Sequence, residues 1–128
     1  DADSRLSMRE KAAVDEWLAS DKGFHIMKDH PWHYTYPILA GMFGCKAGVI
    51  ENISKDIESY EKINWYHSDQ EFLKHVVYPR IKDNVLVHDD WHATPSPLQR
   101  QKYEFVGQVF DENDNTNQEH LDILKKAI

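Results

Sequence analysis

The sequence predicts an α/β fold in which helices flank a mixed sheet, and three observations support it. Apolar residues at helical spacing alternate along the chain with short runs of β-branched and aromatic residues. Hydrophobic residues make up 41% and charged residues 29%, which is the balance of a folded globular domain rather than of a disordered chain. A length of 128 residues suits one domain. We therefore expect residues 1–128 to form a single domain or part of one.

The first predicted helix begins at a capping box. In Ser7-Met8-Arg9-Glu10, the serine hydroxyl can accept a backbone N–H at the helix start, and the glutamate can reach back to the backbone of the serine. The apolar spacing continues over residues 11–19, and Gly23 suits the left-handed turn that often ends a helix. The apolar run at 24–27 follows as the first predicted strand.

The remaining elements follow from apolar spacing, prolines and polar turns. First come a loop at 29–36, a strand at 37–43 and a helix that carries Ile50, Ile53, Ile57 and Tyr60. The next helix begins at Ser68-Asp69-Gln70-Glu71 and is kinked or ended by Pro79, and a strand at 85–87 then ends at His88. The last elements are a loop at 94–97, a strand at 104–110, a polar turn at 111–117 and a helix at 118–128.

Composition and charge exclude several classes of function. The net charge of −7 argues against a broad basic face for nucleic acid or anionic lipid. No apolar run approaches the roughly 20 residues of a membrane span. The single cysteine, Cys45, excludes an internal disulfide framework and a cysteine-based zinc site. No signal peptide is visible, so we expect a soluble cytoplasmic protein, whose oligomeric state the sequence leaves open.

Two acidic motifs are candidate sites. In Asp1-Ala2-Asp3, two carboxylates one residue apart can reach one divalent cation, and oxygen ligands suit Mg²⁺ or Mn²⁺ when phosphates complete the shell. A solvated turn is the alternative. Ser68-Asp69-Gln70-Glu71 is a second capping box, but a carboxylate and an amide at a helix N-terminus can also bind hydroxyl groups in a cleft.

Histidines mark two further candidates. His88 follows a buried strand, where α/β folds place ligand-binding groups, although a hydrogen-bonded structural histidine is the alternative. His88 and His92 also have the spacing of a helical zinc site, which needs a helix in a segment that β-branched residues disfavour. Asp29-His30-Pro31-Trp32-His33-Tyr34 is either a rim for a polar ligand, with rings stacked on sugar faces, or a packed surface loop.

Four segments, taken in this order, resemble those of the metal-dependent GT-A nucleotide-sugar glycosyltransferases, in particular the retaining family-8 type and related proteins of bacteria and large DNA viruses. They are Asp1-Ala2-Asp3, Pro37–Gly44, Asp69-Gln70-Glu71-Phe72-Leu73 and Val85-Leu86-Val87-His88. In this family a D-x-D motif holds Mn²⁺ on the donor diphosphate, and a small-residue strand borders the sugar pocket. A D-Q-D motif touches the donor sugar, and a later histidine is the third metal ligand.

The resemblance implies a glycosyltransferase of the hexosyltransferase type, which moves a sugar from a nucleotide diphosphate donor, most simply a UDP-sugar, to a glycan or another hydroxyl acceptor. It implies that Asp1, Asp3 and His88 bind Mn²⁺ or Mg²⁺, and that Asp69 and Gln70 are the catalytic residues. The substrate-binding residues that it implies are Arg5 and Gly41 on the donor side and His30, Trp32 and His33 on the acceptor side. Retention and inversion of configuration both stay open.

The chain departs from the family pattern at two points. Glu71 replaces the last aspartate of the D-Q-D motif, and the family's nucleotide-binding half lies before the D-x-D motif. We therefore expect this chain to be the C-terminal part of a GT-A, Rossmann-like domain that binds donor weakly by itself. Two other functions stay open, namely a non-enzymatic carbohydrate-binding module and a zinc hydrolase that uses His88 and His92.

Overall fold

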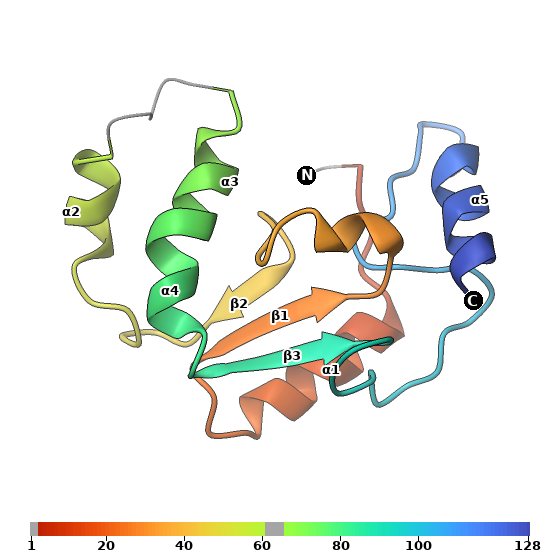
Figure 1. Cartoon of the computed structure of the whole chain (residues 1–128). Helices are drawn as coiled ribbons and strands as arrows, with labels where there is room; N and C mark the ends of the chain where they lie inside the picture. The colour runs from red at the N-terminus through yellow and green to blue at the C-terminus, as the bar shows by residue number, and fades with distance from the viewer. Residues whose placement is uncertain (1–2, 61–65) are drawn as a thin grey trace.

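The computed structural model describes residues 3–60 and 66–128 and contains a three-stranded mixed sheet with the strand order β2-β1-β3 (Figure 1). The central strand β1 (Phe24–Lys28) pairs antiparallel with β2 (Phe43–Cys45) and parallel with β3 (Val85–Asp89). The expected mixed α/β architecture is therefore confirmed, in the form of a small sheet with helices.

Short helices surround this sheet. They are α1 (Met8–Leu18), the 3₁₀ turn η1 (Pro31–Tyr34), α2 (Ile53–Glu58), α3 (Ser68–Phe72), the π-helical turn η2 (Leu73–Val77), α4 (Tyr78–Ile81) and α5 (Gln118–Ala127). In Figure 1, α1 lies on one side of the sheet, α2, α3 and α4 gather near β2, and α5 stands beside η1. Within residues 3–60 and 66–128, no helix has the length and apolar character needed to cross a membrane.

The core forms around β1 because successive side chains of a strand point to opposite faces of the sheet. On one face, Phe24 and Ile26 pack in a buried cluster with Leu73 of η2. On the other face, Met27 packs against Ala13 of α1. Helices therefore cover β1 on both faces, and this packing fixes the position of its carboxyl end.

Several sequence predictions are confirmed. The Ser7 hydroxyl accepts the Glu10 N–H at 3.1 Å, and the Glu10 carboxylate accepts the Ser7 N–H at 2.8 Å, so the capping box of α1 is complete. The elements found where they are expected are the strands that contain 24–27 and 85–87, the helix around Ile53 and Ile57, the polar turn after Asp111 and the terminal helix α5.

The strand predicted at 37–43 is wrong. The observed strand, β2, only begins at Phe43, and the preceding segment turns. Ile38 is completely buried in the core, and Gly41 has a left-handed φ of 78°. The segment therefore folds inward around Ile38 and reverses at Gly41, which its apolar composition alone does not reveal.

The strand predicted at 104–110 is also wrong. Only isolated bridges form there, between Ser4 and Val109 and between Phe110 and Thr116. Alternating polarity indicates a strand only when a neighbouring strand supplies a continuous set of backbone partners, and the described chain supplies single bridges instead.

The helix at 68–81 differs from its prediction at both ends. Ser68 is the first helical residue, so the predicted cap position is wrong; the N-cap is His67, whose φ is 67° and which makes no side-chain capping bond to a described residue. Pro79 does not end the helix, because the wider turn η2 precedes it. A proline ring clashes with the carbonyl four residues earlier in a regular helix, and a π-turn changes that geometry.

The end of α1 also differs, since Gly23 is not left-handed. The C-cap is Ala19 in the right-handed region, and the residues with positive φ among those described do not include Gly23. Gly23 is instead required by close packing, because a Cβ there would lie 2.5 Å from the Val49 side chain.

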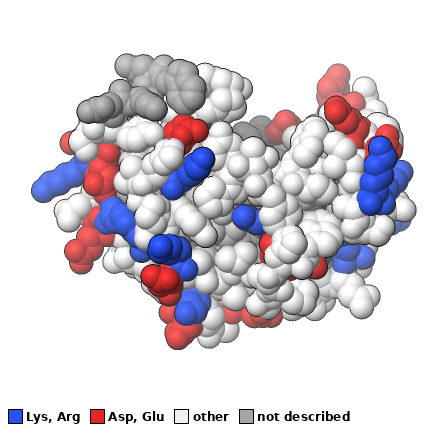
Figure 2. Space-filling model, in the orientation of Figure 1, with Lys and Arg blue, Asp and Glu red and all other residues white. Residues whose placement is uncertain are grey.

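Charges of both signs are mixed over the face drawn in Figure 2. Lys and Arg side chains lie among Asp and Glu side chains there, so neither sign forms a continuous field on this face. This distribution gives this face no stripe for a polyanion.

Candidate substrate-binding site

Two aspartates follow the parallel strand pair at the same edge of the sheet. β1 and β3 pair with Lys28 opposite Asp89, so the next residues, Asp29 and Asp90, leave the two strands side by side. This carboxyl edge is where α/β folds place ligand-binding groups.

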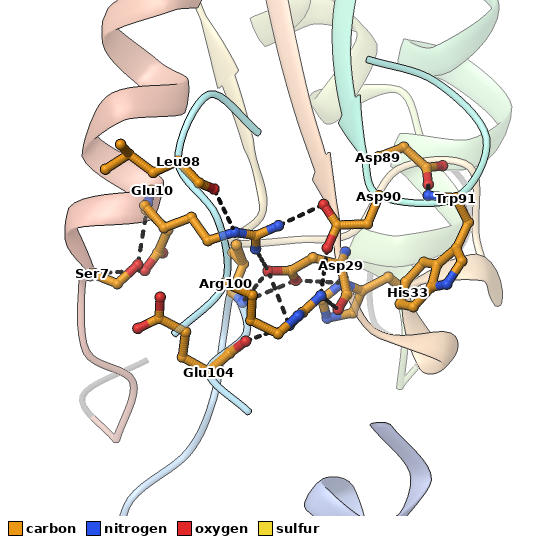
Figure 3. A network of polar contacts seen from close by, with 12 residues as sticks. Ser7, Glu10, Asp29, His33, Asp89, Asp90, Trp91, Leu98, Arg100 and Glu104 are labelled. Carbon is orange, nitrogen blue, oxygen red and sulfur yellow. Dashed lines mark hydrogen bonds and ion pairs between the residues drawn. The ribbon is translucent and has the colours of Figure 1, made fainter. Parts of the chain in front are cut away.

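Two arginines close a polar network around these aspartates. Arg9 of α1 donates to the carboxylates of both Asp29 and Asp90. Figure 3 labels Asp29, Asp90 and Arg100 of this network. Arg100 donates to the Asp90 carboxylate at 2.5 Å and to the Asp29 backbone carbonyl at 2.7 Å. The Val106 N–H donates to the Asp29 carboxylate at 3.0 Å. The network therefore joins α1, the ends of two strands and the segment after Arg100.

Burial decides the electrostatics of this network. The side chains of Arg9 and Asp29 are only 4% and 3% exposed. Burial raises the pKa of Asp29 to about 6, and the Val106 N–H and the two guanidinium groups oppose that shift. Asp29 is therefore ionised at neutral pH, with donors on both of its carboxylate oxygens. Because these charges satisfy one another, the network fixes the surrounding walls rather than binding an anion.

A pocket of about 300 Å³ adjoins the network and is shared by three segments that are distant in sequence. Its lining consists of Ser4, Arg5, Leu6 and Glu10, then Ala40, Gly41 and Met42, and finally Val106 and Gly107. We call it the Arg5–Gly41 pocket. Since Val106 also donates to Asp29, the buried network holds one wall of this pocket in place.

Gln70 connects the start of α3 to the wall of the Arg5–Gly41 pocket that Ala40 forms. Its side-chain oxygen accepts the Ala40 N–H at 2.6 Å, and its side-chain nitrogen donates to the Ile38 carbonyl at 3.3 Å. Gln70 is nearly buried, whereas the neighbouring Asp69 is exposed. The structure thus gives Gln70 the task of positioning residues 38–40 and leaves the Asp69 carboxylate accessible to a ligand.

The beginning of the chain packs against residues near its end. Asp1 lies outside the described residues, and Asp3 is exposed. The Asp3 carbonyl accepts the Phe110 N–H at 2.8 Å. Arg5 pairs with Asp114, and its guanidinium carbon stands 4.4 Å from the centre of the Phe110 ring. Arg5 therefore lines the pocket, and its guanidinium group pairs with residues from the C-terminal part of the chain.

His88 lies in a buried histidine pair. Its Nδ1 is 2.7 Å from Nε2 of His25, and its Nε2 is 3.2 Å from the carboxylate of Glu16 on α1. The Trp17 ring stacks on His25 with centroids 5.3 Å apart. Burial, and secondly the neighbouring His88, lower the pKa of His25 to about 4, so this ring is neutral at physiological pH.

Of the residues expected to bind a metal ion, Asp3 is suited to that role and His88 is not. Asp3 is an exposed carboxylate and suits a hard cation, but both ring nitrogens of His88 already contact protein groups. Over residues 3–60 and 66–128, no cluster of three or more His, Cys, Asp or Glu side chains is arranged to hold a metal. As described, His88 therefore does not fit the role of third ligand.

The predicted acceptor residues divide into buried and exposed members. His30 is 1% and His33 is 4% exposed, whereas Trp32 is 47% exposed. His30 accepts the Trp32 N–H through Nδ1, and its Nε2 is 2.9 Å from the His120 carbonyl. His33 accepts the Asp29 N–H at 3.1 Å. Of the three, Trp32 has the surface that could stack on a ligand.

The helix that a zinc site at His88 and His92 requires is not present in this segment. His88 lies in β3, and His92 follows in a turn whose N–H groups bond the carboxylate of Asp89. The two imidazoles therefore do not share a helix face, which the spacing requires for one zinc ion.

Motif reasoning missed Arg100 and did not connect Arg9, Asp29 and Asp90, which the fold brings into one network. One signal was available, because Phe24–Lys28 and Val85–Asp89 are each followed directly by an aspartate. When two parallel strands pair, the residues that directly follow them lie next to each other at the same edge of the sheet.

Comparisons with models of known protein families, with curated proteins and with solved structures find no match to this chain. The functional argument therefore depends on the residues and their geometry alone.

Proposed function

We propose that the chain functions in a metal-dependent GT-A glycosyltransferase, which transfers a sugar from a nucleotide diphosphate donor, most simply a UDP-sugar, to a hydroxyl acceptor. One observation carries the proposal. Ser4 and Arg5, which follow the D-x-D motif directly, share a pocket with Ala40 and Gly41, and Gln70 bonds the backbone N–H of Ala40. Three segments chosen for their order in the sequence thus adjoin one another.

The proposal gives each residue a role. Asp1 and Asp3 are the proposed ligands of Mn²⁺ or Mg²⁺, which would neutralise charge on the donor diphosphate. Arg5 lines the donor pocket, and Gly41 leaves it open, since a Cβ built there would have no heavy atom within 4 Å. The exposed carboxylate of Asp69 orients hydroxyl groups of the donor sugar.

Donor binding tests the proposal directly. We expect calorimetric titration with a UDP-sugar at high concentration to give weak but saturable binding in Mn²⁺ and still weaker binding in EDTA. Asp3→Asn should abolish the dependence on Mn²⁺. Asp15→Asn makes the same chemical change at an exposed carboxylate that pairs with Lys11, and it should bind donor normally. Equal binding with and without Mn²⁺ would contradict the metal-dependent function.

Asp69→Asn tests the catalytic assignment. Because Asp69 is exposed and Gln70 makes the structural contacts, the variant should keep its melting temperature. We expect sugar transfer to fall by about 10²-fold, the effect of losing one positioned polar group. Unchanged turnover would show that Asp69 only stabilises the helix start.

A carbohydrate-binding module without catalysis is the second candidate. The observation in its favour is that His88 is engaged by His25 and Glu16, since a binding module needs no third metal ligand. Binding of sugar in EDTA without any release of UDP from a UDP-sugar would favour this function over transfer.

A further inference from the structure

A second, larger pocket lies beside the start of α3. It has a volume of about 510 Å³ and opens between β2, α2 and the helix that begins at Ser68. Phe43, Ile53, Ile57 and Phe72 are among its walls. We call it the apolar pocket. Its volume lies within the range of about 300–1,000 Å³ that is typical of small-molecule sites.

Few polar groups line this pocket. Among its described lining residues, the polar groups are the Asp69 carboxylate, the hydroxyls of Ser68 and Tyr60 and the Cys45 thiol, and the other residues are aliphatic or phenylalanine. Asp69 is exposed, so its carboxylate stands at the solvent edge of a largely apolar surface. A ligand that matches this lining has an apolar body and one hydroxyl group, which would donate to one oxygen of the Asp69 carboxylate while the other oxygen accepts from the donor sugar.

The position of the pocket relates it to the donor site. Asp69 lines the apolar pocket, and the next residue, Gln70, bonds the wall of the Arg5–Gly41 pocket through Ala40. A hydroxyl bound at Asp69 would therefore lie one residue along α3 from the contact that supports the wall of the Arg5–Gly41 pocket. The buried histidines His30 and His33, by contrast, have their ring nitrogens against protein groups.

We propose that the apolar pocket binds the apolar body of the acceptor, so that the acceptor class is a phenol or alcohol with an aromatic or aliphatic body rather than a free sugar. This inference extends the proposed function by naming the acceptor. In the transfer, the acceptor oxygen forms the new glycosidic bond, the bond between the sugar and the diphosphate breaks, and the acceptor proton leaves with the nucleoside diphosphate.

The first test measures binding alone. 2-Naphthol, an intrinsically fluorescent phenol, is titrated into the full chain in EDTA and without donor. We expect saturable binding with a micromolar to millimolar Kd, the range for a ligand of about ten heavy atoms. Ile57→Lys should raise that Kd at least about tenfold, because it places a charge in the pocket wall. Leu18→Lys is the matched control, since Leu18 is a similarly exposed leucine on α1 and should leave the Kd unchanged.

The native cysteine supplies a second readout that needs no variant. Cys45 is exposed and lines the apolar pocket, so saturating 2-naphthol should slow its reaction with a thiol reagent several-fold. The absence of saturable binding, an equal Kd in Ile57→Lys and Leu18→Lys, or an unchanged Cys45 reaction rate would each overturn the assignment of the pocket.

Separate measurements distinguish this inference from the proposed function. If the protein binds a UDP-sugar with Mn²⁺ and binds 2-naphthol, but never glycosylates it, the acceptor role is overturned. If no UDP-sugar binds, the glycosyltransferase proposal and the acceptor role both fail, while binding of 2-naphthol in EDTA would still establish the apolar ligand site. Transfer to 2-naphthol that is lost in Ile57→Lys and kept in Leu18→Lys would support both.

Discussion

Replacing Arg9 by methionine should expose the energetic role of the buried network. The change keeps an unbranched side chain of helical propensity similar to that of arginine, so the main effect is removal of the charge between Asp29 and Asp90. Breaking a buried ion pair on one side costs about 3–5 kcal/mol because the remaining charge loses its partner. Asp29 keeps the Val106 N–H, and Asp90 keeps Arg100, so we expect the lower end of that range.

The expected loss can be converted into a melting temperature. The unfolding entropy is about 2.1 cal/mol/K per residue, which gives roughly 0.27 kcal/mol/K for 128 residues. A loss of about 3 kcal/mol therefore lowers Tm by about 11 °C. Circular dichroism during heating and in urea measures both quantities. Lys11→Met is the control, because Lys11 lies on the same helix but pairs with Asp15 at an exposed position, where a pair contributes less than about 1 kcal/mol.

The result that would refute this reasoning is an Arg9→Met variant no less stable than Lys11→Met. A double-mutant cycle with Asp29→Asn gives a sharper test, since groups in direct contact couple by about 0.5–3 kcal/mol. If the two substitutions add without coupling, Arg9 and Asp29 do not stabilise each other.

Two further predictions concern the histidine pair and its cover. Burial lowers the pKa of His25 to about 4, so between pH 6.5 and 4 the unfolded chain binds a proton that the folded chain does not. The contribution of His25 to stability should therefore be complete above pH 6.5 and fall by about 3 kcal/mol as the pH drops toward 4, while Asp29, whose pKa is raised to about 6, contributes with the opposite sign. Urea midpoints across this range measure the slope, which the exposed His75→Gln variant should share and a His25→Phe variant should reduce. Gly44→Ala should cost about 1–3 kcal/mol, because its Cβ would lie 2.8 Å from the rigid Trp17 ring. Cys45→Ala in the same strand should cost less than about 0.5 kcal/mol in thermal unfolding, and equal losses in the two variants would contradict the packing argument.

Local chemistry explains which parts of the fold could be predicted from the sequence. The Ser7 capping box, the strands beginning at Phe24 and Val85, and the cap of α5 at Asn117 depend on residues within a few positions of one another. The strand prediction at 37–43 is wrong because its apolar residues lie in a turn, in which Ile38 is buried and the chain reverses at Gly41. Hydrophobicity shows that a residue is buried but does not show the backbone path that buries it.

The candidate site is only partly predictable for the same reason. The contacts of Arg9 span 20 residues to Asp29 and 81 residues to Asp90, and no spacing rule covers such separations. Gln70 stood out as half of a sugar-binding motif, but its bonds to Ile38 and Ala40, about 30 residues away, give it a positioning role. Whether a polar residue binds ligand or protein depends on partners that only the fold brings near.

Burial and hydrogen bonding therefore separate the candidate site residues into two groups. His30, His33 and His88, the histidines most suggestive of a site in the sequence, are nearly buried, and their ring nitrogens contact protein atoms. A buried polar group that leaves its partner for a ligand must repay the cost of the bond it breaks. Asp69 is an exposed carboxylate that lines the apolar pocket, and Asp3 is an exposed carboxylate directly before Ser4 and Arg5, which line the Arg5–Gly41 pocket. Binding a ligand at either carboxylate breaks no buried bond. Substitutions at Asp3 and Asp69 should therefore change function with little effect on stability, whereas substitutions of these histidines should lower stability first, and this difference makes the two carboxylates the decisive positions to test.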